Sequence, residues 1–132
     1  FELNVLKILE NPFTNKCKIS LPVIINKECI QFYEWKNKDV LCLNNYGICE
    51  PLKTKILTPN VILLPLLAYD SNRYRLGYGK GFYDRYLNKY LKKNKKIITV
   101  GIAFLFQKYH NLPFSKNDVK LDYILNEKGL IK

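Results

Sequence analysis

Three glycines and a lysine in the middle of the chain have the spacing of an anion-binding loop. The segment from Arg75 to Asp84 contains Gly77, Gly79 and Gly81, with Lys80 between the last two. Glycine has no Cβ, so the backbone can turn tightly and bring successive N–H groups close to a ligand. A helix is expected from Gly81 onward, and its N-terminus would present a positive dipole end to the same place. The pattern predicts a cradle for phosphate oxygens, to which the Lys80 ammonium adds a full charge.

The loop matches neither of the common phosphate-binding motifs. The Walker motif needs four residues between its first glycine and Gly-Lys-[Ser/Thr], whereas here Gly81 follows Lys80. The glycine spacing is G-x-G-x-G, which also differs from the dinucleotide motif G-x-G-x-x-G. From the residues alone a second interpretation therefore stays open, in which the glycines only make a tight strand-to-helix turn and Lys80 is solvated.

Asp84 also has two interpretations. In the first turn of a helix, a carboxylate is stabilised by the helix dipole by roughly 0.3–1 kcal/mol without any ligand. Alternatively, Asp84 faces the cradle and binds Mg²⁺, a hard cation that takes one or two carboxylates together with phosphate oxygens. Tyr78, Phe82 and Tyr83 are either core residues or a flat aromatic wall for a heterocycle, and helical periodicity favours the core for Phe82.

Hydrolytic triads have no support in this sequence. His110 is the only histidine, and no serine lies in a G-x-S-x-G motif. Without an evident nucleophile, catalysis would rest on positioning and electrostatics, which suits phosphoryl transfer.

The elements that would position the loop are strands and a helix. Val61 to Leu64 is a continuous apolar run, which predicts a strand buried on both faces at the centre of a mainly parallel sheet. A helix from Gly81 onward and a buried strand from Ile97 to Phe104 follow. Strand, loop, helix and strand in this order imply a right-handed crossover and a layered α/β fold. The other expected elements are a helix ending before Asn11-Pro12 and strands at Lys18 to Ile25, Ile30 to Trp35, Val40 to Leu43 and Tyr123 to Asn126.

Length and charge favour one compact domain with an anionic partner. The chain has 132 residues, of which 48% are hydrophobic, and we expect residues 1–132 to form a single domain. Lys and Arg outnumber Asp and Glu by 22 to 11, and the net charge of +11 favours nucleotides, polyglutamates, nucleic acids or phospholipid surfaces as partners. A general bias toward lysine explains this charge equally well. The longest apolar run, Val61 to Tyr69, is too short to span a bilayer, so we expect a soluble protein.

The four cysteines indicate a reduced, cytoplasmic setting. They are spread singly, with no C-x-x-C pair and no clustered histidines, which argues against a zinc site or a redox motif. Each lies among aliphatic residues, where a thiol behaves as a small hydrophobic side chain. The cysteines are Cys17, Cys29, Cys42 and Cys49.

The central segment is specific enough to indicate a family. Arg75-Leu76-Gly77-x-Gly79-Lys80-Gly81-Phe82-Tyr83-Asp84, preceded by Leu64-Pro65-x-x-Ala68-Tyr69-Asp70, closely resembles the signature of 5-formyltetrahydrofolate cyclo-ligases, also called methenyltetrahydrofolate synthetases. The resemblance covers essentially the whole chain, and the central signature is far more discriminating than the flanks. The flanking matches, in the family's order, are Glu2, Leu21-Pro22, Gly47 to Pro51, Gly101 to Phe104, Gln107, Leu112-Pro113, Asp118 and Leu121-Asp122.

This resemblance implies a fold and a reaction. The implied fold is an α/β three-layer sandwich with a mainly parallel central sheet, related to the ribose-phosphate isomerase and CoA-transferase group. The implied reaction is the MgATP-dependent cyclisation of 5-formyltetrahydrofolate to 5,10-methenyltetrahydrofolate, with release of ADP and phosphate. In the family, the formyl oxygen attacks the γ-phosphate, N10 of the folate closes the ring on the resulting iminophosphate, and phosphate leaves.

The resemblance also implies roles for individual residues. The implied Mg²⁺ ligands are Asp84 and Asp122, and Lys80 and Arg75 are implied to be catalytic. Tyr78 stands where some members have arginine, which removes one phosphate donor. The implied ATP-binding residues are Arg75, Gly77, Tyr78, Gly79, Lys80, Gly81, Phe82 and Tyr83. The implied folate contacts are Glu2, Tyr78, Gly79, Lys80, Gly81 and Phe82.

The start of the chain departs from the family pattern. Members begin with a helical segment whose Lys and Arg side chains also hold the nucleotide, and nothing in this sequence corresponds to it. One alternative to an active enzyme therefore stays open, an inactive remnant that binds a nucleotide weakly. The basic charge leaves a second alternative open, a module that holds single-stranded nucleic acid on exposed tyrosines and lysines. The second alternative explains the charge but not the glycine cradle. The expected partners are 5-formyltetrahydrofolate and MgATP, with no membrane, and we expect a monomer.

Overall fold

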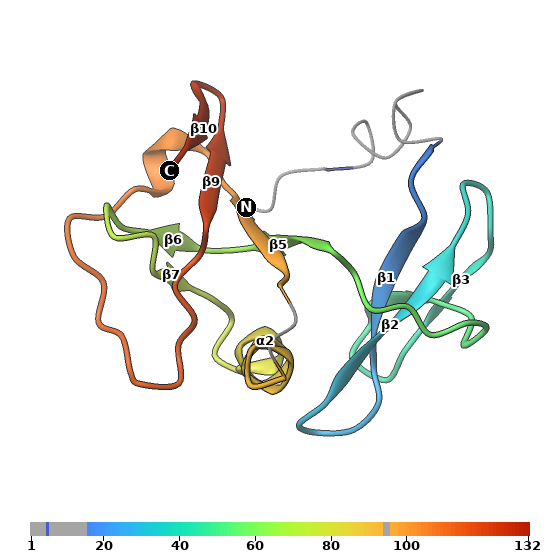
Figure 1. Ribbon diagram of the computed structural model, residues 1–132. Coiled ribbons are helices and arrows are strands. Elements are labelled where there is room, and N and C mark those ends of the chain that lie inside the picture. Colours follow the sequence, from blue (N-terminus) through green and yellow to red (C-terminus); the bar gives the residue numbers. More distant parts are fainter. Residues whose placement is uncertain (1–4, 6–15, 94–95) are drawn as a thin grey trace. The chain divides into compact units, whose positions relative to one another are not determined.

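Figure 1 shows the computed structural model of the chain, which describes residue 5, residues 16–93 and residues 96–132. The helix expected before Asn11-Pro12 and the folate contact implied at Glu2 lie outside the described residues. The described chain divides into two compact units, of which one ends at Pro59 and the other runs from Asn60 to Lys132. The single domain expected for residues 1–132 stays a prediction.

The described part of the unit that ends at Pro59 contains two antiparallel hairpins. β1 (Ile19–Ile24) pairs with β2 (Ile30–Trp35) over its whole length, and β3 (Leu41–Leu43) pairs with β4 (Cys49–Pro51). The Asn26 side chain accepts N–H bonds from two residues in the turn between β1 and β2, so an asparagine turn fixes this hairpin. The strands predicted here are confirmed, while β4 was not predicted.

The unit from Asn60 onward contains a four-stranded mixed sheet and one described helix. The strand order is β10-β9-β8-β5, with parallel pairs β5–β8 and β8–β9 and an antiparallel pair β9–β10. The helix α2 (Phe82–Leu91) connects the parallel strands β5 and β8, which confirms the predicted strand–loop–helix–strand order and the α/β class. The strands of this sheet are β5 (Val61–Pro65), β8 (Ile98–Ile102), β9 (Tyr123–Asn126) and β10 (Gly129–Ile131).

Two expectations about this sheet are wrong. β5 was expected at the sheet centre, but among the described strands it lies at the end of the order, and β8 lies between β5 and β9. Burial alternates along β5, since Ile62 is buried and Val61 is half exposed, so only one face is fully covered. The apolar run predicts that a strand forms, but residue types alone do not determine which strands pair with it. β8 also ends at Ile102 rather than Phe104, because a 3₁₀ turn at Leu105–Gln107 follows.

The sheet and helix share a closely packed core. Leu64, Leu87, Leu121 and Ile124 are almost fully buried. A Cβ on Gly101, in the middle of β8, would lie 2.7 Å from Leu121 Cδ1, so only glycine lets these side chains approach the strand.

The buried side of α2 is formed by Tyr86 and Leu87. Burial raises the pKa of the Tyr86 phenol, and its hydrogen bond with Tyr90 raises that pKa further, so Tyr86 stays neutral.

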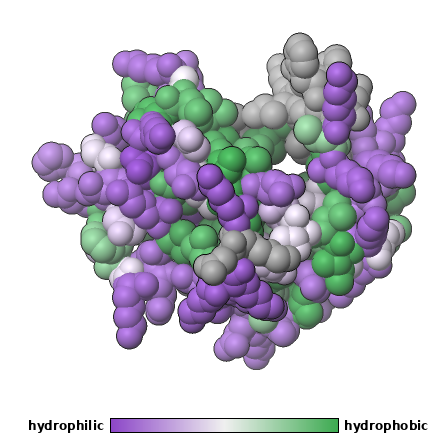
Figure 2. Space-filling model, in the orientation of Figure 1, coloured by the Kyte–Doolittle hydropathy of each residue, from purple (hydrophilic) through white to green (hydrophobic). Residues whose placement is uncertain are grey.

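The visible surface is largely hydrophilic. Figure 2 shows hydrophilic side chains, drawn in purple, over much of the visible face. None of the described helices is both long and apolar enough to cross a membrane.

Candidate functional site

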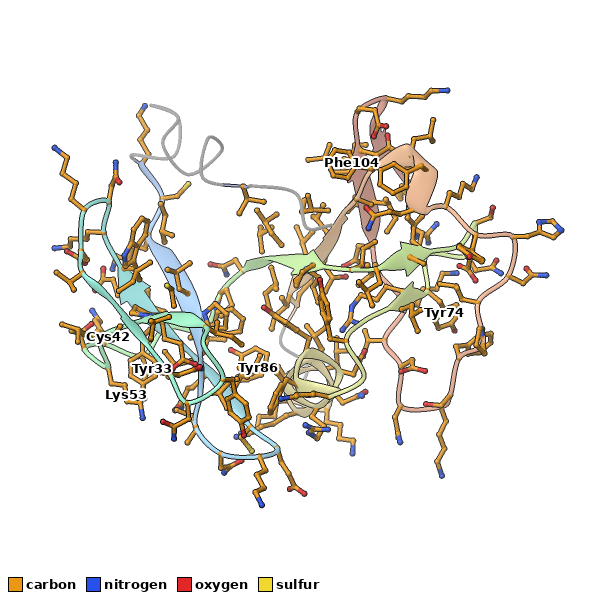
Figure 3. The ribbon with its side chains drawn as sticks, turned by 180° about the vertical axis from the view of Figure 1, so that it is seen from behind. Tyr33, Cys42, Lys53, Tyr74, Tyr86 and Phe104 are labelled. Atoms are coloured by element: carbon orange, nitrogen blue, oxygen red, sulfur yellow. The ribbon has the colours of Figure 1, made fainter. Side chains whose placement is uncertain are left out.

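A short hairpin delivers the chain to the glycine loop. β6 (Ala68–Tyr69) and β7 (Arg75–Leu76) pair antiparallel, with Tyr69 opposite Arg75. Tyr74, labelled in Figure 3, lies on this hairpin immediately before β7. Neither strand was predicted, because two residues are too few to show periodicity. The hairpin places Arg75 at the first position of the loop that was expected to bind phosphate.

The buried carboxylate of Asp70 holds the turn of this hairpin. Its Oδ1 accepts N–H bonds from Asn72 at 2.9 Å and Tyr74 at 3.0 Å, and its Oδ2 accepts the N–H of Leu112 at 3.3 Å. Asp70 is only 2% exposed, and a buried charge of this kind is tolerated when hydrogen bonds replace its water. Asp70 therefore ties the hairpin to the segment that follows β8.

Arg75 and Asp84 bind each other across the loop. The Arg75 Nη2 lies 3.0 Å from the Asp84 Oδ2, and the two side chains are only 6% and 13% exposed. The Arg75 guanidinium also lies 6.0 Å above the Tyr83 ring centre. The buried Nε atom of Arg75 has no hydrogen-bond partner, so the hydrogen-bonding capacity of this guanidinium is incompletely used.

Asp84 lies in the first turn of α2, as predicted, and both of its oxygens accept bonds. Besides the pair with Arg75, its Oδ1 accepts the N–H of Val119 at 3.1 Å. Asp84 thus joins the helix to the hairpin on one side and to the segment before β9 on the other. A carboxylate has about four lone-pair sites, so each oxygen can still accept one further partner.

The glycine loop itself has the backbone that its sequence suggested. Gly79 and Gly81 have φ angles of 82° and 63°, in the left-handed region that glycine enters without strain. Gly81 is the residue before α2, and no side chain caps the helix there. The first N–H groups of a helix have no acceptors within the helix, so they can donate hydrogen bonds to a ligand at the glycine loop. Lys80 is exposed beside them.

The aromatic residues of the loop do not form part of the core. Tyr78 is 59% exposed, and Phe82 and Tyr83 are half-buried. The core position that periodicity favoured for Phe82 is wrong, because Phe82 is the first residue of the helix and lies under the Arg85 guanidinium, 5.3 Å from its ring centre.

Asp122 belongs to a separate arrangement at the start of β9. Its Oδ2 accepts the Thr99 N–H at 2.8 Å and the Thr99 hydroxyl at 2.9 Å. Asp122 is exposed, unlike Asp84. No group of three or more histidine, cysteine, aspartate or glutamate side chains that could hold a metal ion occurs within the described part of the chain.

The donor set nonetheless fits Mg²⁺ and a triphosphate. Mg²⁺ is bound by one or two carboxylates plus phosphate oxygens rather than by an all-protein cage, so Asp84 or Asp122 alone would be enough on the protein side. The uncapped helix start and the two left-handed glycines are features that a bound anion would complete. A pocket of about 300 Å³ elsewhere, between Ile24 and Tyr46, contains none of the predicted site residues.

Sequence reasoning missed two residues of this site. The role of Asp70 was hidden because Asp70-Ser71-Asn72 is typical of any turn. Arg85 was missed because it follows the signature, although its Nη2 donates to the Lys80 carbonyl at 2.7 Å. A basic residue four positions after the helix-starting glycine is the signal that could have found it.

Comparisons with known proteins give one consistent result. Residues 2–127 match the model of the 5-formyltetrahydrofolate cyclo-ligase family. The chain is 32% identical over 131 residues to a 5-formyltetrahydrofolate cyclo-ligase of Haemophilus influenzae, an alignment that covers 94% of this chain and 69% of the relative. It is 43% identical over 79 residues to the enzyme of that name from Mycoplasma pneumoniae, covering 58% of this chain and 46% of the relative.

Solved structures agree with these sequence matches. The 5,10-methenyltetrahydrofolate synthetase of Aquifex aeolicus superimposes with a TM-score of 0.76 at 31% identity, over 98% of this chain and 64% of that one. The corresponding Mycoplasma pneumoniae structure superimposes with a TM-score of 0.66 at 27% identity, over 93% and 65%. The chain therefore spans about two thirds of the length of these two structures.

Proposed function

This chain belongs to the 5-formyltetrahydrofolate cyclo-ligase family, and from that membership we propose that it catalyses the ATP-dependent cyclisation of 5-formyltetrahydrofolate to 5,10-methenyltetrahydrofolate, with release of ADP and phosphate. The observation that carries the proposal is the loop from Arg75 to Gly81, which places a buried guanidinium, an exposed lysine and an uncapped helix start together. These are the groups that hold the charge of a transferring phosphoryl group.

In the proposed reaction, the formyl oxygen forms a bond to the γ-phosphorus as the bond from that phosphorus to ADP breaks. N10 of the folate then attacks the activated carbon and loses its proton to solvent, and the carbon–oxygen bond breaks to release phosphate. The loop amides and Lys80 would hold the γ-phosphate oxygens, and Arg75 would stabilise the charge that develops on them. The protein's contribution is positioning and electrostatics, since no side chain forms a covalent intermediate.

The remaining site residues take their proposed roles from the resemblance of their motifs to the family signature. Asp84 and Asp122 would hold Mg²⁺, which neutralises phosphate charge when bound. The other ATP contacts would be Gly77, Tyr78, Gly79, Gly81, Phe82 and Tyr83. The folate contacts would be Glu2, Tyr78, Gly79, Lys80, Gly81 and Phe82.

The layer arrangement, the cellular setting and the oligomeric state of the protein are also proposals. We expect the mixed sheet to be the middle layer of a three-layer sandwich of the ribose-phosphate isomerase and CoA-transferase group, which the β5–α2–β8 connection supports. The four cysteines, all unpaired, support a reducing, cytoplasmic setting. We also expect a monomer.

The direct test is to incubate the chain with 5-formyltetrahydrofolate and MgATP and to follow the near-ultraviolet absorbance of the methenyl product. The proposal predicts an absorbance increase that requires ATP and is lost when a non-hydrolysable ATP analogue replaces it. ADP release should match methenyl formation one to one. A chain that binds MgATP but forms no product would be the inactive remnant, and a chain that binds neither substrate would contradict the proposal.

A further inference from the structure

Lys80 stands at a point of the loop where the backbone has unusual freedom. It is flanked by Gly79 and Gly81, both in the left-handed region, and it is exposed. Glycine gives up more conformational freedom on ordering than any other residue, so a lysine between two glycines is not held in place by its own backbone. Some other group must fix this part of the loop if it is to bind a ligand in one geometry.

Arg85 supplies two bonds to consecutive residues of the loop. Its backbone N–H donates to the Gly81 carbonyl at 3.0 Å, which is the first hydrogen bond of the helix. Its guanidinium Nη2 donates to the Lys80 carbonyl at 2.7 Å. The guanidinium is itself oriented by the Phe82 ring, whose centre lies 5.3 Å away.

The absence of a side chain at Gly81 leaves room for the Arg85 guanidinium. A Cβ at Gly81 would lie 2.9 Å from the Arg85 Nη1, so a side chain there would force the end of Arg85 to shift. The missing side chain therefore has two uses, since it permits the left-handed backbone and leaves room for Arg85.

The bond from Arg85 also sets the direction of one amide. The described peptide bonds are all trans, and in a trans peptide the C=O and the next N–H point to opposite sides. Because Arg85 draws the Lys80 carbonyl toward the helix, the Gly81 N–H points away from Arg85. We propose that Arg85 is a positioning residue that aims the Gly81 N–H and the Lys80 backbone at the ATP phosphates, an inference that rests on the proposed function.

The role of Arg85 differs from that of a phosphate-binding cation. The Arg85 guanidinium binds the Lys80 carbonyl and not the phosphates. Its removal would therefore make the loop more mobile without removing a direct contact with ATP. The loss applies equally to bound ATP and to the transition state, so the KM for ATP should rise while kcat changes little.

The experiment measures ATP affinity by calorimetry and steady-state kinetics for the whole chain, Arg85→Ala, Arg85→Lys and Lys89→Ala. We expect Arg85→Ala to weaken ATP binding and raise the KM for ATP by about tenfold, with kcat within about twofold. Arg85→Lys keeps the charge but lacks the planar guanidinium, so it should recover little of the loss. Lys89→Ala removes a positive charge from the last turn of the same helix and should bind ATP normally.

A readout without ligand completes the test. Amide hydrogen exchange of the ligand-free chain should be faster at Lys80 and Gly81 in Arg85→Ala than in the wild type, with an unchanged melting temperature. If Arg85→Ala binds ATP as tightly as the wild type, or if Arg85→Lys restores full affinity, the positioning role is overturned while the proposed function stands. If the wild-type chain binds no ATP at all, the proposed function is wrong, and the proposed positioning of the Gly81 N–H toward the ATP phosphates is wrong as well.

Discussion

We propose different ligands for Arg75 and Asp84, ATP for the first and Mg²⁺ for the second, yet the two side chains bind each other in the ligand-free chain. The contact of 3.0 Å between two side chains that are 6% and 13% exposed is a largely desolvated ion pair. Such a pair adds little net stability compared with apolar residues, but removal of one partner leaves the other charge buried and uncompensated. At the residue scale, Arg75 and Asp84 are therefore needed for the stability of the fold as well as for the proposed ligand binding.

Asp84→Asn should consequently destabilise the fold. We expect the free energy of unfolding to fall by roughly 3 kcal/mol, because Arg75 loses its buried counter-charge. Chemical denaturation of the ligand-free chain measures this. The double variant Arg75→Met with Asp84→Asn should be more stable than Asp84→Asn alone, since it no longer buries an unpaired cation. Equal stability of Asp84→Asn and the wild type would show that Asp84 acts only as a surface carboxylate at the helix start.

Lys80 should behave in the opposite way, with a large effect on activity and none on stability. Its side chain is exposed at the helix start, so Lys80→Ala should unfold at the wild-type temperature. Turnover should fall by ~10²–10³, as when one preorganised transition-state donor is removed. The matched control is Lys89→Ala, which should keep full turnover. Unchanged turnover in Lys80→Ala would remove Lys80 from the catalytic machinery.

At the scale of the element, the glycine loop depends on the backbone angles of Gly79 and Gly81. Either residue changed to alanine should lower the free energy of unfolding by roughly 1–2 kcal/mol, because left-handed φ angles strain a residue with a Cβ. The two variants should differ in ATP affinity. Open space surrounds a Cβ at Gly79, whereas a Cβ at Gly81 meets the Arg85 guanidinium, so Gly81→Ala should weaken ATP binding more. The reverse order in a calorimetric titration would contradict this account of the loop.

The sequence predicted the longer elements of the fold well because their apolar residues are periodic or continuous. β2 and β9 have the predicted limits, and β1 and β5 differ by one residue at their ends. The elements that were missed have two or three residues each, too few for a periodic pattern: β4, β6, β7 and β10. The position of β5 in the sheet was wrong because strand order depends on pairing between distant segments.

Less of the site than of the fold could be predicted. The glycine loop, Lys80 and the place of Asp84 on the helix follow from local sequence and from the family resemblance. The Arg75–Asp84 pair, the bond from Val119 to Asp84 and the three N–H bonds to Asp70 depend on how separate segments pack. Residue types alone do not encode those contacts, so the ion pair came as a finding of the structure.

At the scale of the whole molecule, the charge of +11 invites nonspecific binding of polyanions. A nucleotide held in one loop and a nucleic acid held along a surface respond differently to salt. Raising the salt from about 50 to 200 mM weakens binding through 6–10 phosphate contacts by roughly 10³–10⁵. We expect the ATP affinity of this chain to fall by less than about tenfold over that range, because few phosphates are involved. A steep loss for ATP, matched by tight binding of single-stranded oligonucleotides, would favour the nucleic-acid alternative.

The proposed function requires the triphosphate of ATP to bind to the glycine loop and the first turn of α2. The most direct measurement is a residue-resolved amide hydrogen-exchange or NMR titration of the chain with MgATP. We expect the largest changes at the amides of Gly79, Lys80, Gly81 and the first turn of α2. MgATP binding that leaves these amides unchanged and perturbs another part of the chain would contradict the proposed function.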